Sequence, residues 1–299
     1  MKKFIGVFIC VLCFAGLIEA QQLPQYSNYM INDYVLNPAL SGTQDNFEVK
    51  SNNRYQWVGI TDAPRTYILS ANGPYKSKNM GYGGYLFTDI TGPTRRIGFS
   101  LSYAYHVKLN EKMKLSLGLS GGLLQFAVDG SKLTFHDQGD VALSNGMQSV
   151  IVPDFGFGAL FHTDNYYIGA SVPQLYQSKL KFFDYTTSTL STLATHYFLM
   201  GGYKYNLNDN IRIEPSVLVK FVNPAPVQAD IGVRVVYKNM AWAGVGYRTS
   251  DAIPVMVGYT YQNYLMFAYS YDIITSNLRN YSTGTHEIMF GLKFNRAKK

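Results

Sequence analysis

The sequence predicts an all-β protein, a transmembrane antiparallel β-barrel of about 14 strands that follows a cleaved signal peptide. Three observations lead to this prediction. Apolar and polar residues alternate with a period of two over most of the chain after residue 45. Most of the alternating segments reach the roughly 9–11 residues that a tilted strand needs to cross a bilayer. The mean hydropathy of −0.06 is near neutral, as expected when lipid-facing and lumen-facing residues alternate.

The composition excludes several other classes of protein. The chain of 299 residues is 47% hydrophobic and only 15% charged, which argues against disorder. It lacks the runs of about 20 apolar residues that a bundle of membrane helices needs. The formal charge of +7 is spread along the chain without the basic runs typical of nucleic-acid binding, so we expect no nucleic-acid partner. A mild basic excess on an exported protein instead suits anionic outer-membrane lipid.

Residues 1–20 form the predicted signal peptide. Lys2 and Lys3 begin it, an apolar stretch covers residues 4–17, and a small-residue exit predicts cleavage between Ala20 and Gln21. The alternative, an N-terminal membrane anchor, is disfavoured because about 14 apolar residues are too few to span a bilayer.

Both cysteines, Cys10 and Cys13, lie inside this signal. Neither follows the Leu-small-small pattern of a bacterial lipoprotein, which argues against lipidation. After cleavage the mature chain keeps 279 residues and no cysteine. It would therefore contain no disulfide, no thiolate metal site and no cysteine nucleophile.

Residues 21–45 are not strand-like and form a separate predicted segment before the barrel, which covers 46–299. We expect this segment to lie at the periplasmic end of the barrel or to fold into its lumen. In the first case it could contact secretion machinery, and in the second it could plug the barrel. The sequence leaves these two alternatives open.

Turn signals divide residues 46–299 into fourteen expected strands, and an even number lets a closed barrel have both ends of its wall in the periplasm. Glycine–tyrosine pairs such as Gly81-Tyr82 and Gly258-Tyr259 near strand ends suit aromatic girdles at the membrane interfaces. The expected strands are 46–60, 64–75, 81–89, 95–108, 112–128, 150–162, 165–172, 194–207, 210–222, 226–238, 240–249, 252–261, 264–272 and 284–295.

The connections between these strands fall into two kinds. The long ones, 129–149, 173–193 and 273–283, are all odd-numbered when counted from the first hairpin. Because outer-membrane barrels have short periplasmic turns and longer external loops, we expect the odd connections to face outside. The even connections are short, and each contains an asparagine, which tolerates the positive φ of tight hairpins. These residues are Asn79, Asn110, Asn165, Asn208, Asn239 and Asn263.

Two soluble architectures are alternatives to the membrane barrel. A β-sandwich of 279 residues would be unusually large, and a propeller would show a repeat of about 40–50 residues. The polar face of the second half carries charges of both signs, which we expect to pair inside the lumen. On a soluble sheet the same charges would face solvent. They are Arg212, Glu214, Lys220, Asp230, Arg234, Lys238, Arg248, Asp272, Glu287 and Lys293.

The sequence offers little catalytic or metal-binding chemistry. His136, Asp137 and Asp140 in the first long loop are the best candidates for an acid–base or metal cluster, but they supply too few ligands for a metal site. The remaining histidines fit turn or lumen polarity, although His286 beside Glu287 would suit a hydrolase if a nucleophile lay nearby. We therefore expect no catalytic, cofactor-binding or metal residue, and no enzyme activity. These histidines are His106, His162 (near Asp164), His196 and His286.

Several motifs in chain order closely resemble the PorP/SprF family of Bacteroidetes, and the resemblance covers essentially the whole mature chain. The motifs are Pro24-Gln25-Tyr26-Ser27-Asn28-Tyr29-Met30, Asn32, Asn37-Pro38-Ala39, Arg54-Tyr55-Gln56-Trp57, Ala63-Pro64-Arg65-Thr66-Tyr67, Pro153-Asp154-Phe155-Gly156-Phe157-Gly158, Tyr167-Ile168-Gly169-Ala170-Ser171-Val172-Pro173-Gln174 and Gly284-Thr285-His286-Glu287-Ile288-Met289.

The resemblance implies a non-enzymatic outer-membrane component of the type IX secretion system, which exports proteins and drives gliding motility. Some members of the family look like core parts connected to periplasmic ring components, and others are partners of one secreted adhesin. The expected role is a barrel anchor or docking platform, with cargo bound at the external loops. The alternative is a passive outer-membrane diffusion porin. The sequence does not decide between a core part and a dedicated partner.

Overall fold

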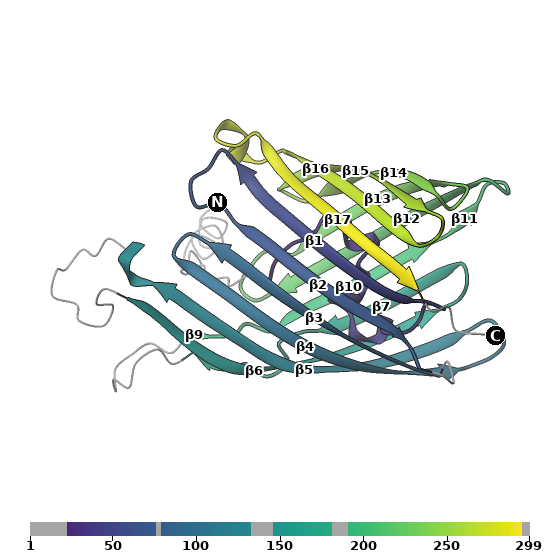
Figure 1. Cartoon of the computed structure of the whole chain (residues 1–299), viewed down its shortest axis with the longest axis horizontal. Coiled ribbons are helices and arrows are strands. Elements are labelled where there is room, and N and C mark those ends of the chain that lie inside the picture. The colour runs from purple at the N-terminus through teal and green to yellow at the C-terminus, as the bar shows by residue number, and fades with distance from the viewer. Residues whose placement is uncertain (1–22, 76–78, 133–145, 181–190, 295–299) are drawn as a thin grey trace, which may run out of the picture.

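The computed structural model describes residues 23–75, 79–132, 146–180 and 191–294. They form a closed antiparallel barrel (Figure 1), so the predicted fold class and the count of fourteen wall strands are confirmed. The wall strands are β1 (Phe47–Val58), β2 (Arg65–Pro74), β3 (Met80–Thr91), β4 (Thr94–Lys108), β5 (Lys114–Asp129), β6 (Met147–His162), β7 (Tyr166–Val172), β10 (His196–Tyr203), β12 (Ile211–Val222), β13 (Gln228–Tyr237), β14 (Ala241–Arg248), β15 (Ala252–Tyr261), β16 (Leu265–Ile274) and β17 (Gly284–Phe294).

Each wall strand pairs with its neighbours in the chain, and β1 pairs with β17 to close the barrel. Three short strands are found besides these fourteen: β8 (Lys179–Leu180) and β9 (Ser191–Thr192) form a separate two-stranded sheet, and β11 (Tyr205–Asn206) pairs with β12 just after β10 ends. The expected strand 194–207 is thus interrupted at Lys204, where pairing with β7 has stopped.

The helical elements among the described residues are short 3₁₀ turns. They are η1 (Asn28–Met30), η2 (Asp33–Leu36), η3 (Pro38–Leu40), η4 (Gly130–Lys132) and η6 (Asn277–Asn280). No helix in the described part of the chain is long and apolar enough to cross a membrane.

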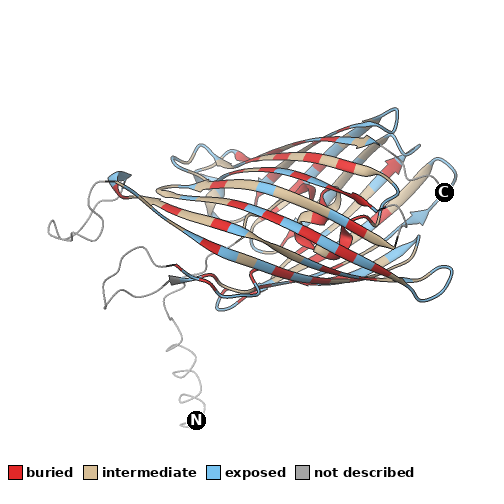
Figure 2. Ribbon diagram, turned by 60° about the horizontal axis from the view of Figure 1, so that its bottom comes forward, coloured by how far each residue is buried: buried red, intermediate tan, exposed pale blue. Residues whose placement is uncertain are grey.

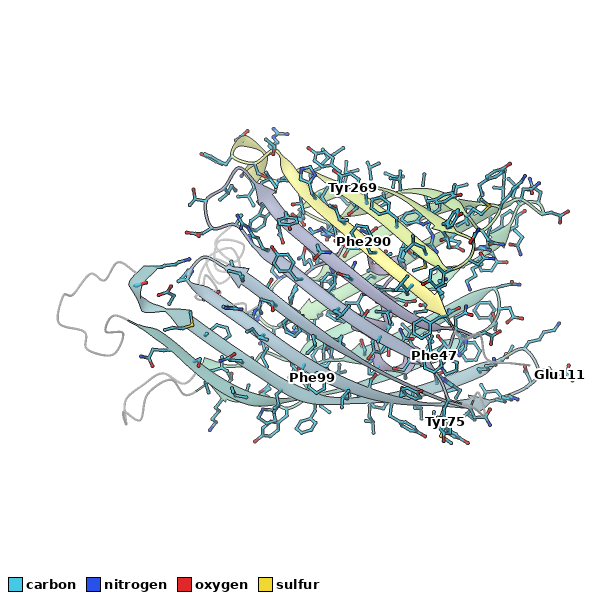
Figure 3. The ribbon with its side chains drawn as sticks, viewed as in Figure 1. Phe47, Tyr75, Phe99, Glu111, Tyr269 and Phe290 are labelled. Atoms are coloured by element: carbon cyan, nitrogen blue, oxygen red, sulfur yellow. The ribbon has the colours of Figure 1, made fainter. Side chains whose placement is uncertain are left out.

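The two faces of the wall differ as the period of two predicts. Buried and exposed residues alternate along the strands (Figure 2). On β4, Leu101 is 56% exposed, whereas Ala104 on the inward face is fully buried. Aromatic side chains such as Phe99 and Phe290 project from the outside of the barrel (Figure 3). An apolar exterior over a polar interior is what a barrel in lipid requires.

The asparagine turns lie at one end of the barrel, which we call the inner mouth. Asn239 and Asn263 adopt positive φ, and the side-chain oxygens of Asn110 and Asn208 accept backbone N–H bonds within their own turns. Lys238 also has positive φ and belongs to such a turn. It is exposed, so its predicted place on the lumenal face is wrong.

The opposite end carries the odd-numbered connections, and we call it the outer mouth. The long connections begin after β5, β7 and β16, and they include η4, the β8–β9 pair and η6. A cluster of Leu124, Val152, Leu180 and Leu193 packs the β8–β9 pair onto β5 and β6. The β8–β9 pair therefore covers part of the outer mouth next to β5 and β6.

Residues 23–43 lie inside the barrel, and we call them the strap; it is the purple segment within the wall in Figure 1. The strap begins at the outer mouth, where the backbone N–H of Leu23 donates to Nε2 of His196 at 3.2 Å. It ends at the inner mouth, where Gly42 (φ +70°) lies against Gly81. A Cβ on Gly42 would lie 2.5 Å from the Cα of Gly81, so only glycine fits this approach.

Candidate functional site

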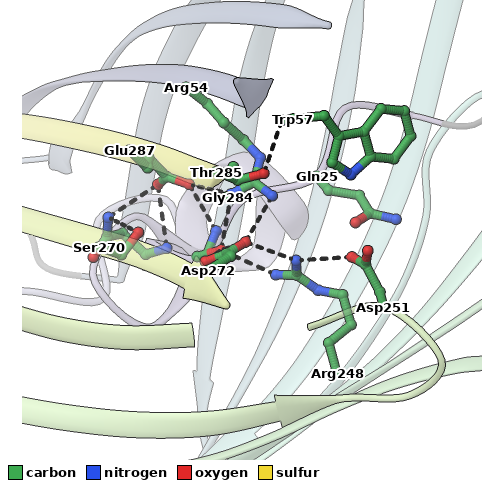
Figure 4. Close-up of polar contacts among 12 residues, drawn as sticks. Gln25, Arg54, Trp57, Arg248, Asp251, Ser270, Asp272, Gly284, Thr285 and Glu287 are labelled. Atoms are coloured by element: carbon green, nitrogen blue, oxygen red, sulfur yellow. Dashed lines mark hydrogen bonds and ion pairs between the residues drawn. The ribbon is translucent and has the colours of Figure 1, made fainter. Parts of the chain in front are cut away.

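The lumen contains a buried ion network that joins inward residues of the second half of the barrel to Arg54 of β1 (Figure 4). Arg248 is central: its Nε lies 2.6 Å from Oδ1 of Asp230, and its Nη1 lies 3.1 Å from Oδ2 of Asp272. Arg54 of β1 reaches the same Asp272 oxygen at 2.8 Å. The network, as we use the term, comprises Arg54, Lys220, Asp230, Arg248, Asp251, Asp272 and Glu287.

The strand period explains why these residues meet. Except for Asp251, which follows β14 in a turn, each occupies an inward position of a strand, so its side chain points to the lumen. The antiparallel register then places partners side by side; Asp230, for example, is directly opposite Arg248. Three cations and four carboxylates nearly cancel, which is what allows them to be buried.

The strap completes this network through Ser27 and Asn28. The Ser27 hydroxyl donates to both Asp272 oxygens at 2.7 Å and accepts from Arg54 at 2.8 Å and Arg248 at 3.1 Å. The backbone N–H groups of Ser27 and Asn28 donate to Glu287 at 2.7 and 3.2 Å. Hydrogen bonds to charged groups stabilise by about 1.5–3 kcal/mol each. These bonds therefore fix Ser27 and Asn28 to the wall.

Asparagine side chains hold the strap at two deeper points. Asn32 donates to Asn52 of β1 at 2.8 Å. The side-chain amide of Asn37 donates to the backbone carbonyls of Ala159 on β6 and Ala170 on β7, at 3.2 and 3.3 Å. The strap thus bonds to several strands around the barrel.

Apolar packing fills the rest of the central lumen. Tyr29, Leu36 and Leu40 of the strap are buried against inward wall residues that include Phe198 and Leu218. Burying an apolar side chain of this size stabilises by about 1.5–3 kcal/mol. The strap is therefore a packed core of the barrel.

A cavity of about 250 Å³ lies at the outer mouth. Leu23 to Tyr26 form one side of it, and inward residues of β10, β12 and β13 form the other. Most of the lining is apolar. Its principal charge is Lys220, which pairs with Asp230 at 2.8 Å.

A larger polar cavity of about 900 Å³ lies at the inner mouth. Glu214 forms an ion pair with Arg212, whose Nε lies 2.5 Å from Oε1 of Glu214, and a second ion pair with Arg234. Across the cavity, Glu48 pairs with Lys50 at 2.6 Å and Lys293 at 3.2 Å. The lining of this cavity therefore carries charges of both signs, and it also includes Asn239 and Asn263 of the asparagine turns.

The predicted inward charges of the second half are confirmed, apart from Lys238. Each of the others has an ion pair inside the barrel. The sequence prediction missed the partners from the first half, above all Arg54 and the strap residue Ser27. For Arg54 a signal was present, because Glu48, Lys50 and Asn52 precede it at alternate positions of the same strand.

The structure does not assemble the predicted histidines into a catalytic site. His136, Asp137 and Asp140 lie outside the described residues. His106 and His162 share the hydroxyl of Ser116, at 2.7 and 3.1 Å, which is a polar contact in the wall.

His286 and Glu287 point to opposite faces of β17. His286 contacts the Tyr269 hydroxyl at 2.7 Å, whereas Glu287 is fully buried in the network. His196 instead accepts the N–H of Leu23 at 3.2 Å. Among the described residues no group of three or more His, Cys, Asp or Glu could hold a metal ion.

The closed wall, the apolar exterior and the filled polar lumen define this chain as an outer-membrane β-barrel protein. Residues 18–292 match the family model described as "Type IX secretion system membrane protein PorP/SprF". The chain therefore belongs to the PorP/SprF family, and the resemblance seen in the sequence motifs is confirmed. Members of this family are membrane components of type IX secretion.

Solved structures with a similar fold include several outer-membrane barrels. The CymD monoaromatic hydrocarbon channel has a TM-score of 0.48 at 13% identity, with 89% of this chain and 92% of that chain covered. The translocator domain of the autotransporter NalP from Neisseria meningitidis has a TM-score of 0.48 at 10% identity, covering 84% and 88%. The toluene transporter TodX of Pseudomonas putida gives 0.47 at 10% identity, covering 88% and 92%. Among curated proteins, none matches the sequence.

Proposed function

We propose that this protein is a non-enzymatic docking platform of the type IX secretion system, which supports the secretion or surface attachment of cargo proteins. The observation that carries the proposal is the strap. Its residues Ser27 and Asn28 are clamped to buried charges, and its apolar side chains pack the central lumen. A lumen filled in this way leaves no space for a protein substrate, so the useful surfaces are the two mouths.

The outer mouth is the proposed site of cargo binding. The β8–β9 pair packs on β5 and β6 and gives the adjoining loops a rigid base. Beside it, Leu175 and Tyr176 are 55% and 62% exposed, which supports contact with an apolar protein surface. The cargo class that we infer is a secreted adhesin or another type IX substrate, such as an adhesin used in gliding motility.

The inner mouth is the proposed contact for the rest of the machinery. Its polar cavity is framed by the short asparagine turns, so nothing large among the described residues shields it from the periplasm. Periplasmic ring components would reach the barrel from this side. We also propose that export uses the signal peptide, with cleavage between Ala20 and Gln21.

A loop replacement tests the docking role. Replacing residues 130–146 by a short glycine–serine linker should abolish surface retention of cargo, measured by antibody labelling of intact cells. The barrel itself should remain inserted, measured by its heat-dependent mobility on gels. The matched control replaces the Asn208–Asn210 turn at the inner mouth and should keep cargo on the surface. Unchanged retention in the loop variant would refute docking at this loop.

Purification of the native protein from membranes separates the remaining alternatives. A co-purifying secreted adhesin supports a dedicated partner of one cargo, whereas ring lipoproteins support a core component. A passive diffusion porin is the alternative function. It predicts a barrel that purifies alone and conducts ions in planar bilayers.

A further inference from the structure

We propose that the start of the strap, at Leu23, is exposed to the outside of the cell, because the strap runs through the barrel from the outer mouth to the inner mouth. The sequence predicts that both ends of the wall lie in the periplasm. In the structure, β1 begins and β17 ends at the inner mouth. The start of the strap instead lies at the opposite end, the outer mouth. The inference concerns topology and does not depend on what the barrel binds.

The contacts of the strap follow the chain in order down the barrel. At the outer mouth, Leu23 bonds to His196, the first residue of β10, and Gln25 donates to Gln228, the first residue of β13, at 2.9 Å. Both strands start at odd-numbered connections. The beginning of the strap therefore lies at the same end as the long loops.

The next contacts lie progressively deeper. Ser27 and Asn28 reach the buried ion network, and Asn37 reaches carbonyls of β6 and β7. Gly42 then packs against Gly81, close to where β3 begins at the inner mouth. The direction of the strap is thus fixed by contacts at its start, middle and end.

Packing also prevents the start of the strap from turning back into the lumen. Leu23 to Tyr26 line the outer cavity, and directly below them Tyr29 and Leu36 are buried against the wall. Leu23 is therefore held at the outer end of the lumen, next to the outer compartment. With the long loops outside, as in other outer-membrane barrels, this compartment is the cell exterior.

Cysteine labelling tests this topology directly, because the expected mature chain has no cysteine of its own. Leu23→Cys should react with a membrane-impermeant maleimide on intact cells. Tyr281→Cys, 74% exposed in an odd connection, is the positive control. Asp209→Cys, exposed in an even turn, should react only after the outer membrane is permeabilised.

A second variant covers the case in which the thiol introduced at position 23 is too deeply packed to react. A short epitope inserted between Gln22 and Leu23 should bind antibody on intact cells, as should the same epitope beside Tyr281. Epitope or cysteine signals at the start of the strap that need permeabilisation, while position 281 reacts on intact cells, would overturn the proposal. Reaction of position 209 but not 281 on intact cells would overturn it too, because the barrel would then be inverted. Neither result depends on cargo binding, so failure of the docking role would be recognised separately.

Discussion

At the scale of single residues, this barrel contains charges that are buried together and that depend on one another as partners. Arg248 has a fully buried side chain and contacts three carboxylates, of Asp230, Asp251 and Asp272. Burying an ion pair costs desolvation, so the pair as a whole is not a large gain in stability. Removing one partner is strongly destabilising, because the other charges remain buried without a countercharge.

Arg248→Met should therefore lower the free energy of unfolding by about 3–5 kcal/mol, measured by denaturant titration of the barrel in detergent micelles. Arg212→Met is the control. Arg212 is 29% exposed, and its partner Glu214 keeps Arg234, so the loss there should stay near 0–1 kcal/mol. Equal losses for the two variants would contradict the central place given to Arg248.

At the scale of elements, the wall and the strap fit each other through glycines. The strap element η3 lies against β5 at Gly118, where a Cβ would be 2.3 Å from the backbone nitrogen of Ala39. It would also lie 2.4 Å from the carbonyl carbon of Pro38. Both atoms belong to the backbone, so no side-chain rotation can relieve the contact.

Gly118→Ala should push η3 off the wall and destabilise the protein by about 1–3 kcal/mol. The readouts are the unfolding free energy and faster proteolytic cleavage within residues 23–43. Gly201→Ala on β10 is the matched control, because its new Cβ would lie 3.5 Å or more from its neighbours. If the strap of the Gly118 variant resisted protease as well as that of the control, the close fit described here would be wrong.

The elements also show where sequence reasoning works and where it stops. The alternation of Leu101, Tyr103 and Tyr105 with small or polar residues predicts a strand in lipid, because each strand carries its own pattern. The strap has no such local pattern. Its Ser27 is satisfied by Asp272, 245 residues away, and such a contact becomes visible only when the barrel is closed.

At the scale of the whole molecule, the strap crosses the lumen of the barrel. It lies between the outer cavity of about 250 Å³ and the inner cavity of about 900 Å³. Both cavities are lined partly by strap residues. A barrel of this size without the strap would keep its polar inner face but lose its packed core.

We expect the full-length barrel not to conduct ions, and deletion of residues 23–41 should make it conduct. Single-channel recording in planar bilayers measures this, with the full-length protein as the reference and the 130–146 loop replacement as a control that keeps the strap. Steady currents through the full-length protein would favour the diffusion porin over the docking platform.

The threaded strap also restricts the order in which the protein can be assembled. The strap is continuous with β1 at the inner mouth, while its other end lies at the outer mouth. It therefore cannot enter an already closed barrel from the outer side. In the simplest assembly route, the sheet closes around the strap, and the pairing of β1 with β17 forms last. A strap that is placed late would delay the pairing of β1 with β17 and leave two strand edges exposed in the meantime, which is a hazard of aggregation.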